Sequence, residues 1–168
     1  MYINKPLLIR DTREKIGHGW DWGEDEIFRG TTLEKLSVGD YSIQGLEHLI
    51  FIDRKESVFE IMKNITEKRF HNLIHKAAKY KYKYIIFEFP ESELVNFPKE
   101  TPKAFATDIN GVHLWKKMKM SAFTVHKSLN TIQTKYGIKM LYCRNTLEGK
   151  IKCHELLTEI YKLECSKK

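Results

Sequence analysis

The sequence lacks the features that would place it outside the cell or in a membrane. Its 168 residues include only three cysteines, and Cys143, Cys153 and Cys165 do not have the spacing of zinc ligands. The N-terminus, MYINKPLLIRD, has neither the cationic nor the apolar region of a secretory signal. No apolar run approaches the roughly 18 residues that a membrane span needs. These absences predict a cytoplasmic protein with reduced thiols and no membrane contact.

The sequence does carry an excess of positive charge. It has 29 Lys and Arg residues against 22 Asp and Glu residues, a formal net charge of +7. A basic balance of this kind favours a polyanionic partner, nucleic acid first. We find no internal repeat and no low-complexity segment, and the length suits one domain, so we expect residues 1–168 to form a single domain.

The hydrophobic periodicity predicts alternating strands and helices. We predict strands at 5–10, 33–43, 49–53, 84–89 and 138–143, and helices at 57–79, 115–136 and 145–163. The second and third strands should form a hairpin, because only a short turn separates them. Ser57 with Glu60 forms a capping box, Asn145 with Glu148 caps the last helix, and Gly137 ends the helix before it.

Two segments show little periodicity. Residues 15–30 are rich in Gly, Trp and acids and predict a long loop, and residues 91–112 predict an inserted loop. Around them, the order of strands and helices predicts an α/β fold, a mixed sheet flanked by helices.

Acidic residues stand at the ends of three predicted strands. These are Asp11, Asp40 and Asp53, with Glu14 close to the first. If the strands are neighbours, the carboxylates converge at one edge of the sheet, where they repel one another unless a cation neutralises them. Oxygen ligands select Mg²⁺ or Mn²⁺, which can activate water and stabilise charge on a phosphoryl group. For any single acid, ordinary surface charge is the competing interpretation.

The lysine that follows these acids suits the same chemistry. Lys55 lies two residues beyond Asp53, so both side chains point to the same face of the strand. Lys55 could orient the attacking water or contact the scissile phosphate. Arg54 points to the opposite face, where we expect it in a supporting ion pair.

Three motifs in this order carry a resemblance to a known family. DTRE at 11–14, VGDY at 38–41 and IDRK at 52–55 resemble the XPF-type structure-specific endonuclease domain, a branch of the PD-(D/E)XK nucleases. That family has V-D-x-R-E, then V-G-D-Y, then V-E-R-K with a further acid downstream. The resemblance extends over 68–70, 84–89 and 120–161. It leaves out the loop 15–30 and the insertion 91–112.

The resemblance implies a PD-(D/E)XK restriction-endonuclease-like fold and metal-dependent hydrolysis of DNA phosphodiesters in branched, flap or junction DNA, as in DNA repair and recombination. It implies Mg²⁺ or Mn²⁺ as cofactor and DNA as partner. The site residues it implies are Asp40, Asp53 and the main-chain carbonyl of Arg54 as metal ligands, Lys55 as catalytic lysine, Asp11 as a further acid with Arg13 and Glu14 in support, and Arg69 reaching the site or the DNA from its helix.

The sequence departs from the family at two positions. Asp53 replaces a glutamate and is one methylene shorter. The downstream acid of the family falls on Phe59, which leaves Glu60, also needed for capping, as the nearest carboxylate. Two alternatives to the branched-DNA nuclease therefore stay open: a catalytically inactive DNA-binding or scaffold module, and a nuclease that cuts ordinary duplex DNA.

Other patterns have both a functional and an ordinary interpretation. The cluster Lys116, Lys117 and Lys119 predicts an extra DNA contact, or else a solvated helix face. His71 and His75 have a zinc-compatible spacing but no third ligand, which favours a solvated pair. The family commonly pairs through its last helices, which implies a homodimer or a partner subunit. The residues available for that contact, or else for the core, are Leu156, Leu157, Ile160 and Tyr161.

The aromatic segments are equally open. The run from Lys79 to Tyr84 interleaves aromatics with cations, which suits base stacking but equally suits the start of a strand. Trp20 and Trp22 could form a flap over substrate, although the acids around them would repel phosphate, so the loop could instead gate the site or bind a protein.

Overall fold

Six strands and five α-helices make up the part of the chain that the computed structural model describes, residues 5–14 and 17–166. The strands are β1 (Leu8–Asp11), β2 (Thr31–Glu34), β3 (Tyr41–Ile43), β4 (Ile50–Lys55), β5 (Tyr82–Phe87) and β6 (Lys139–Tyr142). The helices are α1 (Val58–Ile65), α2 (Lys68–Ala77), α3 (Glu91–Val95), α4 (Ala122–Tyr136) and α5 (Thr146–Cys165), with 3₁₀ turns η1 (Pro102–Phe105) and η2 (Leu114–Lys117). Positions 15–16 of the predicted loop and the Lys-rich end, 167–168, lie outside the described residues.

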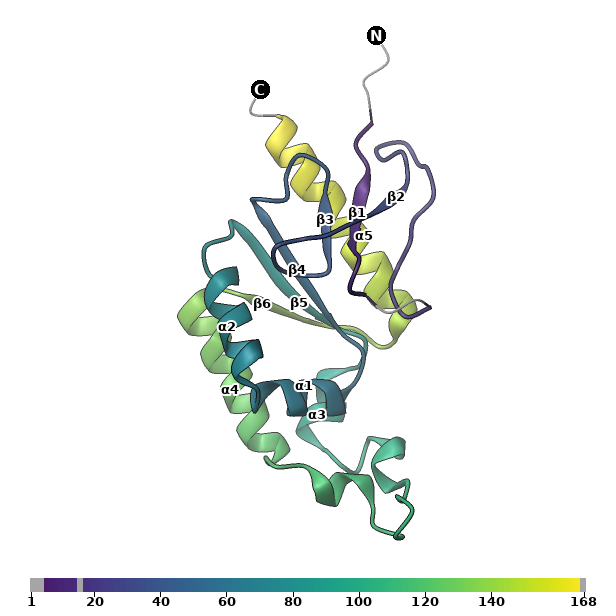
Figure 1. Cartoon of the computed structure of the whole chain (residues 1–168), viewed down its shortest axis with the longest axis vertical. Helices are drawn as coiled ribbons and strands as arrows, with labels where there is room; N and C mark the ends of the chain where they lie inside the picture. The colour runs from purple at the N-terminus through teal and green to yellow at the C-terminus, as the bar shows by residue number, and fades with distance from the viewer. Residues whose placement is uncertain (1–4, 15–16, 167–168) are drawn as a thin grey trace.

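The strands form two three-stranded ladders that lie side by side (Figure 1). In the order β2-β1-β3, β1 runs parallel to β2 and antiparallel to β3. In the order β4-β5-β6 all strands are parallel. The ladders meet where the backbone N–H of Asp40, just before β3, donates to the Ile52 carbonyl of β4 at 2.7 Å. This mixed sheet confirms the predicted fold class.

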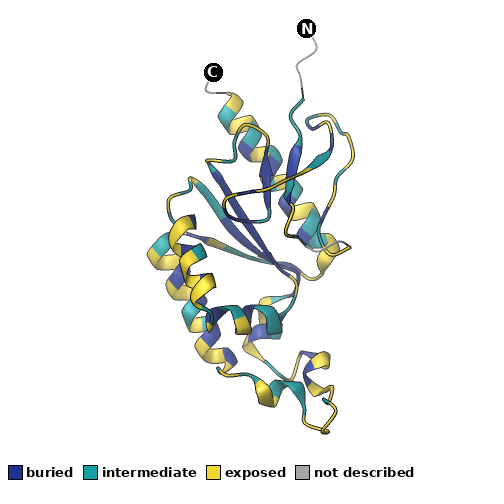
Figure 2. Cartoon of the chain, in the orientation of Figure 1, coloured by how far each residue is buried: buried dark blue, intermediate teal, exposed yellow. Residues whose placement is uncertain are grey.

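Helices cover both faces of the sheet. On one face, Ile50 and Ile52 of β4 pack in one hydrophobic cluster with residues of α5. On the other face, Phe51 packs in a second cluster with residues of α1, α2 and α4. β4 and most of β5 are therefore buried from both sides (Figure 2), as the apolar runs of parallel strands require. Among the described residues, no helix is long and apolar enough to cross a membrane.

The predicted strand at 33–43 and its hairpin are wrong. β2 ends at Glu34 and β3 begins at Tyr41, and the two lie on opposite sides of β1. β3 pairs with β1, whereas β4 pairs with β5. The segment between β2 and β3 leaves the extended conformation because the Leu36 N–H donates to the Asp11 carboxylate at 2.6 Å and Gly39 has a φ of +79°.

The predicted helix at 57–79 is two helices. It breaks where the Thr66 hydroxyl donates to the Lys63 carbonyl at 2.7 Å and Glu67 takes an extended conformation. Both halves keep a buried apolar face, which is why the periodicity continues across the break. The predicted N-cap residues and the glycine C-cap are confirmed: Ser57 accepts from the Glu60 N–H, Asn145 from the Glu148 N–H, and Gly137 is left-handed at the end of α4. The other half of the predicted capping box differs, because the Glu60 side chain accepts from the Glu56 N–H.

Two further boundaries differ from the prediction. The helix predicted at 115–136 begins only at Ala122, because the Ser121 hydroxyl caps it and the residues before it form η2. The insertion 91–112 is not a plain loop, since it contains α3 and η1.

Candidate active site

The acids of the three motifs lie on adjacent segments of the sheet. The Asp11 N–H at the end of β1 donates to the Asp40 carbonyl at 2.8 Å, and the Asp40 N–H donates to Ile52. Gly39 makes the contact between the Asp40 N–H and Ile52 possible. A Cβ atom on Gly39 would lie 2.8 Å from the Ile52 carbonyl oxygen, and its positive φ suits glycine. The glycine before Asp40 therefore lets this acid approach β4.

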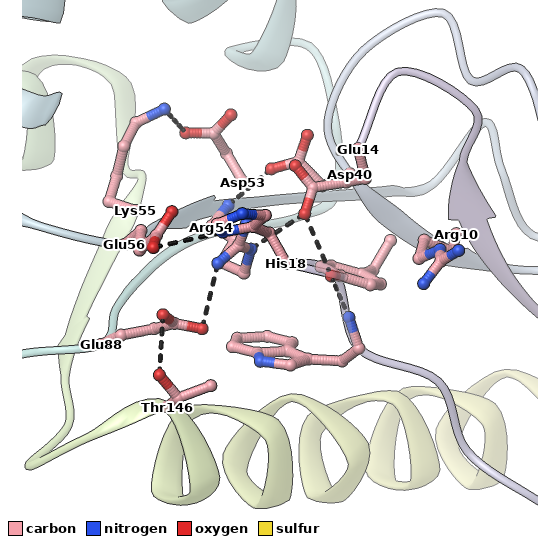
Figure 3. A network of polar contacts seen from close by, with 12 residues as sticks. Arg10, Glu14, His18, Asp40, Asp53, Arg54, Lys55, Glu56, Glu88 and Thr146 are labelled. Atoms are coloured by element: carbon pink, nitrogen blue, oxygen red, sulfur yellow. Dashed lines mark hydrogen bonds and ion pairs between the residues drawn. The ribbon is translucent and has the colours of Figure 1, made fainter. Parts of the chain in front are cut away.

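Asp40, Asp53 and Lys55 form the centre of the site (Figure 3). The Arg54 N–H donates to Asp40 Oδ2 at 2.7 Å, which fixes Asp40 against β4. The side chains of Asp53 and Lys55 share one face of β4, as predicted, and Lys55 Nζ lies 2.7 Å from Asp53 Oδ2. Both side chains are only 7% exposed. A carboxylate oxygen has two acceptor positions, so Asp53 Oδ2 can accept a further ligand beside Lys55 Nζ.

Charges in this centre are strongly coupled. Burial, then the neighbouring Asp53 and Glu14, raise the pKa of Asp40 well above its ordinary value. Burial alone would lower the pKa of Lys55, but Asp53, Glu60 and Asp40 raise it overall. Lys55 is therefore a cation in this arrangement and partly neutralises the acids. A bound cation would relieve the remaining repulsion that raises the pKa of Asp40.

The donor set fits a magnesium or manganese ion. Asp40 and Asp53 offer two carboxylates. The backbone N–H and C=O of one residue in a strand point to the same side, so the Arg54 carbonyl faces the side on which its N–H meets Asp40. No cluster of three or more His, Cys, Asp or Glu side chains suited to a metal occurs in the described ranges. Mg²⁺ commonly uses only one or two carboxylates and completes its shell with water and phosphate.

Glu60 lies at the rim of this centre. Its Oε1 is 3.8 Å from Lys55 Nζ, while its Oε2 accepts from the Glu56 N–H at 2.8 Å. Burial raises the pKa of Glu60. Phe59, which stands where the related family has an acid, packs edge-on against Phe97 with ring centroids 5.5 Å apart. Glu60 thus lies close to Lys55, while its side chain accepts from the Glu56 N–H instead of the Ser57 N–H that a capping box would use.

The Arg54 side chain forms a buried support behind the centre. Its Nε donates to Glu14 Oε2 at 2.9 Å and its Nη1 to Glu88 Oε1 at 3.2 Å. Burial opposes a rise in the pKa of Arg54, but Glu14 and Glu88 raise it overall. The expected ion pair of Arg54 is therefore present, with two partners.

The rest of this support was not predicted. Glu88 also accepts from the Thr146 hydroxyl of α5 at 3.0 Å, and Tyr41 donates to Glu14 at 3.2 Å. The Trp20 ring stacks on Tyr41 with centroids 5.1 Å apart. The one sequence signal for Glu88 is an acid between two phenylalanines in an apolar strand.

Asp11, expected as a further acid of the site, is bound by two donors in this arrangement. It is 1% exposed. Its Oδ1 accepts from Arg13 Nε at 2.6 Å, and its Oδ2 accepts from the Leu36 N–H at 2.6 Å. Burial would raise the pKa of Asp11, but these donors lower it overall. Both oxygens are engaged, so Asp11 and Arg13 hold the loop before Asp40, and Glu14 supports Arg54.

The basic residues expected to contact DNA lie outside this centre. Arg69 is exposed on α2, next to Phe70, whose ring lies 5.4 Å from Lys55 Nζ. Lys116 and Lys119 are exposed, and Lys117 pairs with Asp108.

The two histidines on α2 have separate local contacts. His71 bonds the Ile65 carbonyl at 2.7 Å, and His75 packs edge-on against Tyr136. These contacts account for the pair without zinc.

Comparisons with known proteins agree with the motifs. A family model described as the ERCC4 domain matches residues 25–149. XPF from Aeropyrum pernix in complex with DNA is similar with a TM-score of 0.61 and 16% identity, over 94% of this chain and 66% of that chain. A second structure of XPF from Aeropyrum pernix has a TM-score of 0.59 and 14% identity, over 96% and 69%.

At these identities the similarity concerns the fold. The chain spans about two thirds of the length of both structures. A search of curated proteins finds no match.

Proposed function

Because the chain belongs to the ERCC4 domain family, the XPF-type nuclease domains, we propose that it is a Mg²⁺- or Mn²⁺-dependent DNA endonuclease. It hydrolyses phosphodiester bonds in branched, flap or junction DNA. The observation that supports this most directly is the convergence of Asp40, Asp53 and Lys55 where the two ladders meet. Two neighbouring carboxylates, one of which repels the other strongly enough to raise the pKa of Asp40, are suited to a cation.

Each residue of the centre has a separate role in this proposal. Asp40, Asp53 and the Arg54 carbonyl hold the ion. When bound, the ion activates water and stabilises charge on the phosphoryl group. Lys55 Nζ donates a hydrogen bond to the attacking water or to the scissile phosphate. The Arg54 side chain, held by Glu14 and Glu88, keeps β4 in place.

DNA reaches this centre along exposed basic residues. Arg69 lies on α2 next to Phe70, whose ring contacts Lys55, and binds the DNA backbone nearest the site. Lys116 and Lys119 bind phosphates farther away, whereas Lys117 is engaged with Asp108. The net charge of +7 supports such contacts and makes binding sensitive to salt.

A homodimer or partner subunit through the C-terminal helix remains part of the proposal. Of the four residues available for it, Leu157 and Ile160 are buried in the core, whereas Leu156 and Tyr161 are half-buried. α5 also exposes the apolar side chains of Leu147, Ile151 and Leu163.

A cleavage assay tests the function. Purified protein is incubated with Mg²⁺ or Mn²⁺ and end-labelled duplex, single-strand, flap, fork and four-way-junction DNA, beside Asp40→Asn and Lys55→Ala. Lys35→Ala, an exposed lysine beyond β2, is the matched control. Metal-dependent cleavage by wild type and Lys35→Ala but not by the site variants supports the proposal. Preference for ordinary duplex would instead identify a duplex nuclease.

Thermal unfolding tests the ion separately. An ion at about 100 times its Kd stabilises the folded state by about 2.7 kcal/mol, which raises the Tm of a protein of this size by roughly 5–11 °C. Asp40→Asn should remove that rise. No cleavage and no rise in Tm, with DNA binding intact, would identify a non-catalytic DNA-binding module.

A further inference from the structure

Residues 96–120 form an arm between α3 and α4 that the proposed chemistry does not use. In Figure 1 the arm extends beyond α1 and α3, away from the sheet. It follows α3, which comes directly after β5, and the last residue of β5, Phe87, pairs with Lys55. The chain therefore enters the arm from the end of the sheet that carries the active site.

The base of the arm is packed against the rim of that site. Phe97 contacts Phe59, the neighbour of Glu60 on α1. Thr101 is buried and its hydroxyl donates to the Glu93 carbonyl at 3.3 Å, and Ala104 is fully buried. These contacts fix the direction in which the arm leaves the domain.

The tip of the arm is an ordered turn. Thr107 and His113 form an antiparallel bridge, and the Gly111 N–H donates to the Asp108 carbonyl at 3.0 Å. Asp108 Oδ1 accepts from the N–H groups of Asn110 at 2.9 Å and Val112 at 3.0 Å, and Asp108 also pairs with Lys117. The residue at the apex of this turn is therefore held in place.

That apex residue is Ile109, which is 99% exposed. Two other exposed apolar side chains lie close to it in the sequence, Phe105 at 46% and Val112 at 39%. The arm carries five lysines against two acids, and one of those acids, Asp108, is already paired with Lys117. A fixed apolar apex on a lysine-rich arm suits DNA, where lysines bind phosphates and an aliphatic side chain enters the base stack.

We propose that the arm recognises DNA branch points, with Ile109 entering the stack beside the branch and Lys116 and Lys119 binding the adjacent phosphates. Separating an intact base step costs a few kcal/mol. At a branch the step is already interrupted, so the same insertion costs less there. The arm thus favours branched DNA over continuous duplex. This inference rests on the proposed nuclease function and names how its substrate is selected.

The first test compares Ile109→Ala with Leu33→Ala, a matched truncation of an exposed residue on β2. The ratio of fork cleavage to duplex cleavage should fall about tenfold in Ile109→Ala, the size expected when an aliphatic side chain loses a buried site, and should stay unchanged in Leu33→Ala. An unchanged ratio in Ile109→Ala overturns the proposal.

The second test does not depend on cleavage. Lys55→Ala protein is added to fork DNA that carries 2-aminopurine beside the branch, whose fluorescence rises when the base is unstacked. The rise should occur with Lys55→Ala and be lost in Lys55→Ala with Ile109→Ala. Equal rises overturn the role of the arm. Failure of the nuclease function appears separately, as absent cleavage of every DNA by wild type.

The lysines are tested by the salt dependence of binding. Lys116→Ala and Lys119→Ala should each lower the slope of log affinity against log salt by about one, whereas Lys35→Ala should not. Slopes equal to wild type in both arm variants would exclude these phosphate contacts and contradict the proposal.

Discussion

Replacing Arg54 with alanine should be among the most damaging substitutions near the site. The guanidinium joins Glu14 and Glu88, and the three side chains are 6%, 14% and 2% exposed. Alanine would leave both carboxylates buried without their cation, and breaking a buried pair costs about 3–5 kcal/mol. With about 4 kcal/mol lost, the Tm should fall by roughly 8–16 °C. Urea unfolding followed by far-UV circular dichroism measures the loss directly.

Two companion variants make the Arg54 result interpretable. Arg69→Ala removes an exposed arginine and should change the unfolding free energy by no more than about 0.5 kcal/mol. Arg54→Met combined with Glu14→Gln and Glu88→Gln should recover much of the loss, because no uncompensated charge stays buried. A loss below about 1 kcal/mol in Arg54→Ala would refute the view that the buried network stabilises this side of the sheet.

Two further substitutions test local features. Gly39→Ala should lower the free energy of unfolding in urea by about 3 kcal/mol, because its Cβ would lie 2.8 Å from the Ile52 oxygen at a positive φ. Gly45→Ala is also at positive φ but has nothing within 4 Å, so it should lower the same free energy by only about 1 kcal/mol. Equal losses would contradict the close approach at Gly39. Burial opposes a low pKa for Asp25, but the N–H groups of Phe28 and Ile27 and the nearby His154 lower it below the ordinary 3.8. The ionised Asp25 therefore stabilises the folded state above about pH 3.8, and this stabilisation is lost as the pH falls through the lowered pKa. Asp25→Asn should flatten the fall in Tm below about pH 4, and parallel Tm profiles of the two proteins would refute it.

The central residues were predictable because their chemistry is local in the sequence. Asp53 and Lys55 share a face by the alternation of one strand, and their contact at 2.7 Å follows from that spacing. The Gly39–Asp40 pair signals a close backbone approach. The caps at Ser57, Asn145 and Gly137 were also predictable, since each depends on residues within one helical turn.

The features that the sequence did not predict depend on distant partners. The role of Asp11 is set by the Leu36 N–H, 25 residues away, and that of Glu88 by Arg54 and Thr146. The break between α1 and α2 leaves the hydrophobic period intact, so the period alone could not reveal it. The prediction of a strand at 33–43 was wrong because the apolar alternation continues through Leu36, whose backbone leaves the sheet and donates its N–H to Asp11.

The contact between Glu88 and Thr146 has a consequence for the order in which the molecule becomes complete during synthesis. Every residue of the proposed catalytic centre leaves the ribosome before α5 does. Until α5 docks, Trp20 lacks the helix surface at Gly149, and Glu88 lacks the Thr146 hydroxyl. The support behind Arg54 is then open to water on one side. A nascent chain therefore carries all the side chains of the proposed centre before α5 completes the support behind Arg54.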